Sequence, residues 1–84
     1  MKFCLITFRS VTPAQRGEGA LRHVGIECSV RRTPRWMEEQ GCGYSLRIRQ
    51  ADAQRAVQQL RSEQVPFRKV YLLRENGTAE EIDL

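Results

Sequence analysis

The stretch Lys2-Phe3-Cys4-Leu5-Ile6-Thr7-Phe8 decides the fold, because its side chains are apolar or β-prone on both faces. A strand of this kind is buried on both sides, so we expect it at the centre of a sheet. Cys4 lies inside the stretch, and we interpret it as a packing residue. The segments that follow must supply the neighbouring strands and a cover for the sheet.

The segment after this strand is predicted to form a helix. Ser10 or Thr12 can cap its N-terminus, and Pro13 suits its first helical position. Apolar residues then recur at helical spacing as far as Gly25, which we expect to end the helix.

Periodicity predicts the remaining elements. Apolar and polar residues alternate over residues 26–31 and 44–49, which is typical of half-exposed strands. Residues 51–63 carry a buried stripe at helical spacing and predict a second helix. Residues 67–74 form the last long strand, and Asn76-Gly77 is a two-residue hairpin signal that allows a short edge strand over residues 78–83.

The predicted order is strand, helix, strand, strand, helix, strand. This order is typical of a ferredoxin-like α+β sandwich, in which two helices cover one face of a four-stranded antiparallel sheet. We therefore expect two layers, with residues 78–83 as an addition at the sheet edge. The other sheet face is expected to be polar and basic. Its side chains would come from Glu27, Ser29, Arg31, Arg47 and Arg49.

Length and charge limit the function. The 84 residues are enough for one domain, residues 1–84, with a modest core and a shallow site rather than a deep one. Residues 1–50 hold nine Lys or Arg against four acids, whereas residues 51–84 hold five against six. The basic half indicates an acidic partner, either protein or nucleic acid, or else ordinary solubilising charge.

Cysteine and histidine usage excludes other classes. Three cysteines without a C-x-x-C pair argue against a secreted disulfide framework and fit a reducing cytosol. His23 is the only histidine and the cysteines lack metal-ligand spacing, so no metal or other cofactor is expected. No apolar stretch approaches the ~20 residues that span a bilayer, and no membrane partner is expected.

Cys42 is the candidate reactive residue. It lies between Gly41 and Gly43 in a predicted loop over residues 33–43, where the flanking glycines give its sulfur little cover. Cationic residues near it in the sequence would favour the reactive thiolate. These residues are Arg31, Arg32, Arg35 and Arg47. The alternative is a structural turn that happens to contain a cysteine.

The predicted topology gives Cys42 a setting. The first two strands would run the same way, so Ser10, Thr12 and the loop carrying Cys42 should share one edge. A helix N-terminus there offers free N–H groups and about half a positive charge, which would lower the pKa of a thiol below the ~8.5 of free cysteine. Arg9 and Arg35 are candidates to add charge at this edge.

The same residues carry a family resemblance. The chain resembles the small prokaryotic domain described as putative selenium/sulfur carrier protein-like, which has a strand ending in Phe-x-Ser, a helix with spaced Ala, Glu and Leu, and a later Pro-Arg segment leading to Cys-Gly. The resemblance covers nearly the whole chain. The matching residues are Phe8-Arg9-Ser10, Ala14, Glu18, Leu21, Pro34-Arg35 and Cys42-Gly43.

The resemblance implies a carrier rather than a stand-alone enzyme. Cys42 would bear the sulfur or selenium as a persulfide or selenosulfide, with Ser10 and Glu18 as supporting positions and Pro34-Arg35 shaping the loop. Partner proteins would donate and accept the chalcogen. A hydrolase is not supported by the residues themselves, because no histidine is placed as a base for Cys42.

Two further readings stay open. The basic sheet face could bind RNA, although residues 44–49 contain one aromatic residue, Tyr44, which we assign to the inward face. The domain could also be an interaction module that pairs through its open sheet face or edge strand, for example as a homodimer, and this role is compatible with chalcogen transport.

Overall fold

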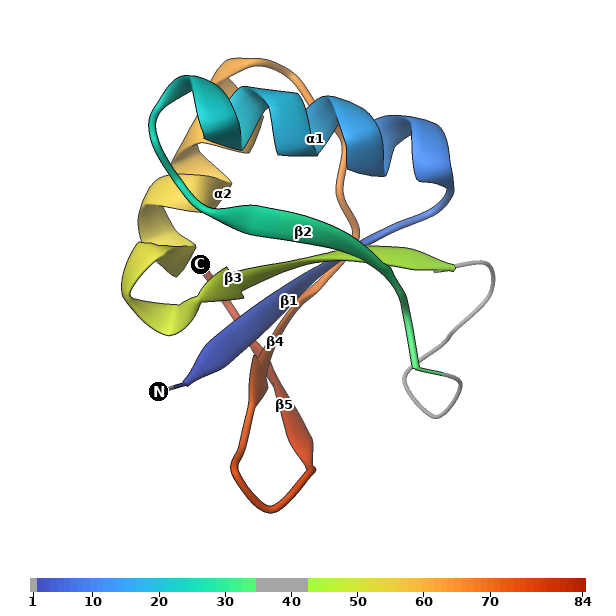
Figure 1. Cartoon of the computed structure of the whole chain (residues 1–84), viewed down its shortest axis with the longest axis vertical. Helices are drawn as coiled ribbons and strands as arrows, with labels where there is room; N and C mark the ends of the chain where they lie inside the picture. Colours follow the sequence, from blue (N-terminus) through green and yellow to red (C-terminus); the bar gives the residue numbers. More distant parts are fainter. Residues whose placement is uncertain (1, 35–42) are drawn as a thin grey trace.

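The computed structural model describes residues 2–34 and 43–84 of the chain (Figure 1). Within these residues the chain forms, in order, strand β1 (Phe3–Phe8), helix α1 (Val11–His23), strands β2 (Cys28–Arg32) and β3 (Tyr44–Arg49), a short 3-10 turn η2 (Gln50–Asp52), helix α2 (Ala53–Ser62), and strands β4 (Val70–Leu73) and β5 (Ala79–Ile82). The prediction for residues 44–49 is confirmed at both ends, whereas the other elements differ by one to three residues.

The strands form one sheet in the order β2-β3-β1-β4-β5, and every neighbouring pair is antiparallel. β1 lies at the centre, as its two apolar faces predicted, and its residues from Cys4 to Phe8 are all buried. The expected α+β class with two helices is confirmed. The expected count of four strands is corrected to five, because β5 forms within residues 78–83 and pairs along the whole of β4.

Both helices cover the same face of the sheet (Figure 1). Their buried side chains meet the inward side chains of β1, β3 and β4 in one core. Gly17 lies at the closest approach: a Cβ built there would stand 3.1 Å from atoms of both Leu46 and Phe8, and 3.2 Å from Leu60. The missing side chain therefore lets α1 pack closely on the sheet.

Helix α1 begins at Val11, two residues before Pro13, which was predicted as its first residue. Ser10 is the N-cap residue, with extended backbone angles, but its side chain makes no capping hydrogen bond. Pro13 is the third helical residue rather than the first. It is tolerated there because the N–H groups of the first turn have no partner within the helix, so nothing is lost when proline lacks one.

The same motif ends both helices. After α1, Gly25 has a φ of +75°, its N–H donates to the Arg22 carbonyl, and the N–H of Ile26 donates to Leu21. This paired arrangement satisfies carbonyls that the last turn leaves open. After α2, Gln64 takes the corresponding place, with a φ of 56°.

The last hairpin differs from its prediction. Residues 75–77 form a three-residue turn, closed by hydrogen bonds from the Gly77 N–H to the Arg74 carbonyl and from the Arg74 N–H to the Thr78 carbonyl. Gly77 has a φ of +86° and Asn76 does not have a positive φ. A two-residue turn of the Asn-Gly type needs a positive φ at both positions, so the two-residue prediction is wrong.

Candidate functional site

The ends of three strands meet at one edge of the sheet. Phe8 at the end of β1 pairs with Tyr44 at the start of β3, and Tyr44 pairs with Arg32 at the end of β2. Just beyond these pairs, the Thr33 N–H donates to the Gly43 carbonyl at 3.0 Å. The first turn of α1 and both flanks of the segment 35–42 therefore lie at the same edge.

Several predicted site residues lie outside the described residues. These residues are Arg35, Gly41 and Cys42. Of the other candidates, Ser10, Thr12 and Arg9 are exposed at the edge just described, and Gly43 is half-buried there. The Ser10 side chain is not used as a cap, and α1 has no carboxylate in its first turn to neutralise the partial positive charge of the helix end.

Glu18 lies elsewhere. It stands eight residues along α1 from Ser10, which at 1.5 Å per residue is about 12 Å along the helix axis. Its carboxylate pairs with Arg22 at 3.2 Å, and its backbone carbonyl accepts a weak contact from the Cys28 sulfur at 3.8 Å. The structure thus places Glu18 against β2 and not beside the N-terminus of α1.

Two of the three thiols are in settings that oppose ionisation. Cys4 is fully buried, and burial raises the pKa of its thiol. Cys28 is half-buried beside the core; burial is also the largest cause that raises its pKa, and the Glu18 carboxylate raises the pKa further, against a smaller lowering by Arg22. The interpretation of both cysteines as packing residues is confirmed by their positions, and neither is suited to be a thiolate at neutral pH.

The position of His23 and the metal-binding potential of the described residues follow from the structure as well. His23 is the last residue of α1, and its Nδ1 lies 3.9 Å from a carboxylate oxygen of Glu63. Its ring is therefore at the negative end of the helix, where the sequence predicted it. Within residues 2–34 and 43–84, no group of three His, Cys, Asp or Glu side chains could hold a metal ion.

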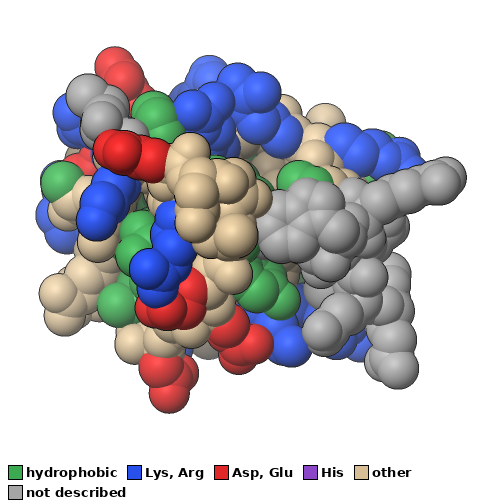
Figure 2. Space-filling model, turned by 90° about the horizontal axis from the view of Figure 1, so that it is seen from below, with side chains coloured by type: hydrophobic (Ala, Val, Ile, Leu, Met, Phe, Trp, Pro, Cys, Tyr) green, Lys and Arg blue, Asp and Glu red, His purple; other side chains and the backbone are tan. Residues whose placement is uncertain are grey.

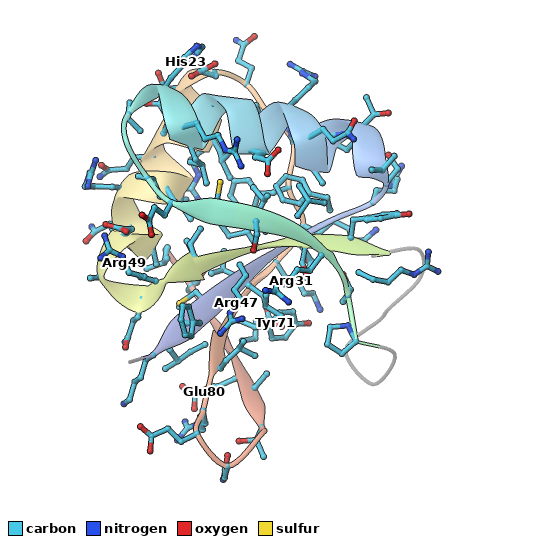
Figure 3. All side chains as sticks on the ribbon, viewed as in Figure 1. His23, Arg31, Arg47, Arg49, Tyr71 and Glu80 are labelled. Carbon is cyan, nitrogen blue, oxygen red and sulfur yellow. The ribbon has the colours of Figure 1, made fainter. Side chains whose placement is uncertain are left out.

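The helix-free face of the sheet carries the expected arginines and, in addition, outward apolar residues of β1 that the prediction of a polar and basic face did not include. Arg31, Arg47 and Tyr71 lie together on this side of the sheet (Figure 3). The guanidinium carbon of Arg47 lies 3.9 Å from the centroid of the Phe3 ring, and Leu5 is 4 % exposed. Figure 2, which views the molecule from below, shows Lys and Arg side chains in several groups, with Asp and Glu side chains both at the upper left and at the bottom of the view.

The missed signal was the outward half of β1. Phe3 and Leu5 alternate with the core residues Cys4 and Ile6, so the strand read as apolar on both faces without revealing what covers its second face. On each face of a sheet, the side chains of a central strand contact the side chains of its two neighbouring strands, and these partners cover it. Here Leu5 stands between Arg47 and Tyr71 in the pairing register.

The fold and this edge define a small α+β domain whose two described cysteines are packing residues. The sequence profile of the family described as "Putative Se/S carrier protein-like" matches residues 3–72, and the chain belongs to that family. No curated protein and no solved structure matches the chain. Among the described residues, no helix is long and apolar enough to span a membrane.

Proposed function

We propose that the protein carries sulfur or selenium on Cys42 and passes it to an acceptor protein. The chain belongs to a family described as carrier-like, and one observation about its cysteines supports the proposal. Burial raises the pKa of the thiols of both Cys4 and Cys28. Of the three cysteines, this leaves Cys42 as the candidate for a reactive thiolate.

Loading proceeds by thiol–persulfide exchange. The Cys42 thiolate attacks the outer sulfur of a donor persulfide, R–S–SH; a new S–S bond forms on Cys42 as the donor's S–S bond breaks, and the donor leaves as the thiolate R–S⁻. The same displacement at the selenium of R–S–SeH gives a selenosulfide. Unloading repeats the exchange toward an acceptor thiol, so no net oxidant or reductant is consumed.

The sheet edge supports this chemistry electrostatically. The N-terminus of α1 presents unpaired backbone N–H groups beside the flanks Thr33 and Gly43. Arg9 is exposed at the same edge, and no ion pair of Arg9 occurs within the described residues. We infer that the Cys42 thiol meets this positive field, which would favour the thiolate and a bound persulfide anion.

The proposed reaction needs no deep pocket. Apart from β5, the element order is that of a ferredoxin-like sandwich, and we infer a ferredoxin-like domain extended by one edge strand. In such a shallow domain the donor and the acceptor must supply the rest of the reaction site. Membership in the family accordingly implies partner proteins, and we propose a persulfide-bearing donor and a thiol-bearing acceptor as the two partners.

Mass spectrometry tests the carrier function. The protein is incubated with a cysteine desulfurase and cysteine, and a mass increase of one sulfur atom, about 32 Da, is expected on the peptide that contains Cys42. The Cys42→Ser variant should show no added sulfur, whereas Cys28→Ser should load like the unaltered protein. Absence of sulfur on Cys42, or equal loading of the Cys42→Ser variant, contradicts the proposal.

A further inference from the structure

A hollow of about 600 Å³ lies beside β2, and its lining includes neither Arg9 nor the flanks Thr33 and Gly43. Side chains from four elements line it: α1, β1, β2 and β3. Those used below are Arg22, Phe3, Ser29, Arg31, Arg47 and Arg49. Four arginines thus line one hollow, whose lining residues include a single carboxylate, that of Glu27.

Only two of the four arginines are neutralised. Arg22 pairs with Glu18 at 3.2 Å, and Arg49 donates two hydrogen bonds to the buried carboxylate of Asp52, at 3.1 and 3.0 Å. In the described part of the chain, no ion pair forms at Arg31 or Arg47. Among the described residues, two of the positive charges at the hollow therefore have no ion-pair partner.

The side chains of Arg31 and Arg47 lie close to each other on adjacent strands. Ser29 is the cross-strand partner of Arg47, and the Arg31 Nε donates to the Ser29 hydroxyl at 3.3 Å. The Arg31 guanidinium therefore turns along β2 toward Arg47, and the two side chains lie together in Figure 3. Like charges placed this closely repel each other, unless an anion lies between them.

Arg47 is also held in place. Its guanidinium carbon lies 3.9 Å from the centre of the Phe3 ring, a cation–π arrangement that fixes the side chain. Its Nε is buried and has no hydrogen-bond partner in the described structure. Because this nitrogen is covered by protein, a ligand in the hollow would be bound by the remaining donors of the guanidinium, its Nη groups.

We propose that this hollow binds the phosphoryl group of a small phosphomonoester between Arg31 and Arg47. One guanidinium suffices for the two oxygens of a carboxylate, whereas two guanidiniums on adjacent strands match a dianion with three free oxygens. The volume is within the range of small-molecule sites and exceeds the need of a bare phosphate ion, so the body of the ligand occupies the remainder.

This site is independent of chalcogen transport, and its test uses the Cys42→Ser protein, which has no candidate carrier thiol. The Arg Nε–H resonances are followed by ¹H–¹⁵N NMR during titration with phenyl phosphate, inorganic phosphate and benzoate. We expect saturable shifts of Arg31 and Arg47 with phenyl phosphate, weaker binding of inorganic phosphate, and the weakest binding of benzoate. Phosphomonoesters lose their second charge near pH 6, so phenyl phosphate should bind several-fold more weakly at pH 5 than at pH 7.5.

Matched variants separate the site from general attraction. Arg31→Gln and Arg47→Gln should each weaken phenyl phosphate binding by about tenfold or more, the loss of one charge-assisted contact. Arg47→Lys keeps the charge but not the paired N–H donors of arginine. Its affinity for phenyl phosphate should lie between those of the unaltered protein and of Arg47→Gln. Arg16→Gln removes the same charge from an exposed position outside the hollow and should change the affinity by less than about twofold.

Three results would overturn the proposal. The first is an equal loss of affinity in Arg16→Gln, which would mean binding by net charge alone. The second is benzoate binding as tight as that of phenyl phosphate, which would define a carboxylate site. The third is binding of a single-stranded RNA oligonucleotide that is tighter than that of phenyl phosphate and equally sensitive to Arg31 and Arg47, which would assign the arginines to a nucleic-acid surface.

Discussion

Gln64 stands after α2 where Gly25 stands after α1, and each is the residue with positive φ that follows the helix cap, at 56° and 75° respectively. The hydrogen bonds of the two turns correspond as well: the N–H of Val65 donates to Leu60, just as the N–H of Ile26 donates to Leu21. The left-handed conformation costs a residue with a side chain about 1 kcal/mol and costs glycine almost nothing.

We predict that Gln64→Gly stabilises the protein by about 0.5–1 kcal/mol, because it removes backbone strain at an exposed position. Gly25→Ala is the matched change in the other direction and should destabilise by about 1 kcal/mol. The free energy of unfolding from urea titrations measures both. A loss of stability in Gln64→Gly would show that its side chain, and not its backbone, matters at this turn.

The two glycines of α1 should respond to alanine with opposite signs. Both would gain up to about 1 kcal/mol from helix propensity. At Gly19 a Cβ meets nothing within 4 Å, so Gly19→Ala should stabilise by that amount. At Gly17 the Cβ would press on Leu46, Phe8 and Leu60, so Gly17→Ala should destabilise by about 1–3 kcal/mol. Thermal unfolding of the two variants checks the contrast; shifts in the same direction would contradict it.

Asp52 is expected to stabilise the entry to α2. Its side chain is 8 % exposed and accepts hydrogen bonds from the Nε and Nη2 of Arg49, with Arg55 at 3.5 Å. Asp52→Asn should cost about 1–3 kcal/mol, because it weakens charge-assisted bonds at a buried acceptor. Glu18→Gln breaks a more exposed pair and should cost at most about 1 kcal/mol. Equal effects in urea unfolding would argue against a special role for Asp52.

Alkaline pH should lower the stability through the buried thiols. The folded-state pKa values of Cys4 and Cys28 are raised, so these thiols keep their protons where the unfolded chain has already released them. Their contribution to the free energy of unfolding is complete below about pH 8.5, the thiol pKa in the unfolded chain, and is lost as the pH rises above that value. Between pH 7.5 and 9.5 the free energy of unfolding should fall less in Cys28→Ala than in the unaltered protein. Identical slopes would mean that Cys28 does not contribute.

The pH dependence of Cys42 alkylation should measure the effect of the positive electrostatic field at the sheet edge on this thiol. We expect iodoacetamide to modify one thiol rapidly in the folded protein and all three after unfolding, because Cys4 is buried and Cys28 is half-buried. The rate at Cys42 should reach half its maximum below pH 8.5. Arg9→Gln should shift that midpoint upward, whereas Arg68→Gln, another exposed arginine, should not. A midpoint at or above 8.5 in the unaltered protein would contradict an activated thiolate.

The sequence predicted elements best where one local signal decided the outcome. The alternation over residues 44–49 gave β3 without error, and Gly25 marked the end of α1 because its positive φ closes the cap. The start of β4 was predicted too early. There the Thr7 N–H donates to the Lys69 carbonyl, but the Thr7 carbonyl accepts from the Arg68 N–H, and the Lys69 N–H donates to the Thr7 hydroxyl at 3.0 Å. Two residues thus stand opposite Thr7, and the regular pairing with β1 begins only at Val70. No local pattern at residue 69 reveals a partner 62 positions away.

The candidate site was predictable only in part. Strand order follows from the alternation of elements, so the shared edge of Ser10, Thr33 and Gly43 could be expected. The placement of Cys42 itself stays a prediction. The hollow between Arg31 and Arg47 could not be expected from spacing, because it depends on the bend of Arg31 toward Ser29 and on the stacking of Arg47 over Phe3.

The central place of β1 also governs how this chain acquires its structure. Strand β1 needs both of its neighbours, and these are β3 and β4, the latter beginning at Val70. Contacts between segments so distant in sequence slow folding relative to a helical bundle of equal length. A nascent chain that ends before Val70 would leave one side of β1 without its partner, so the sheet cannot be completed before β4 has been synthesised.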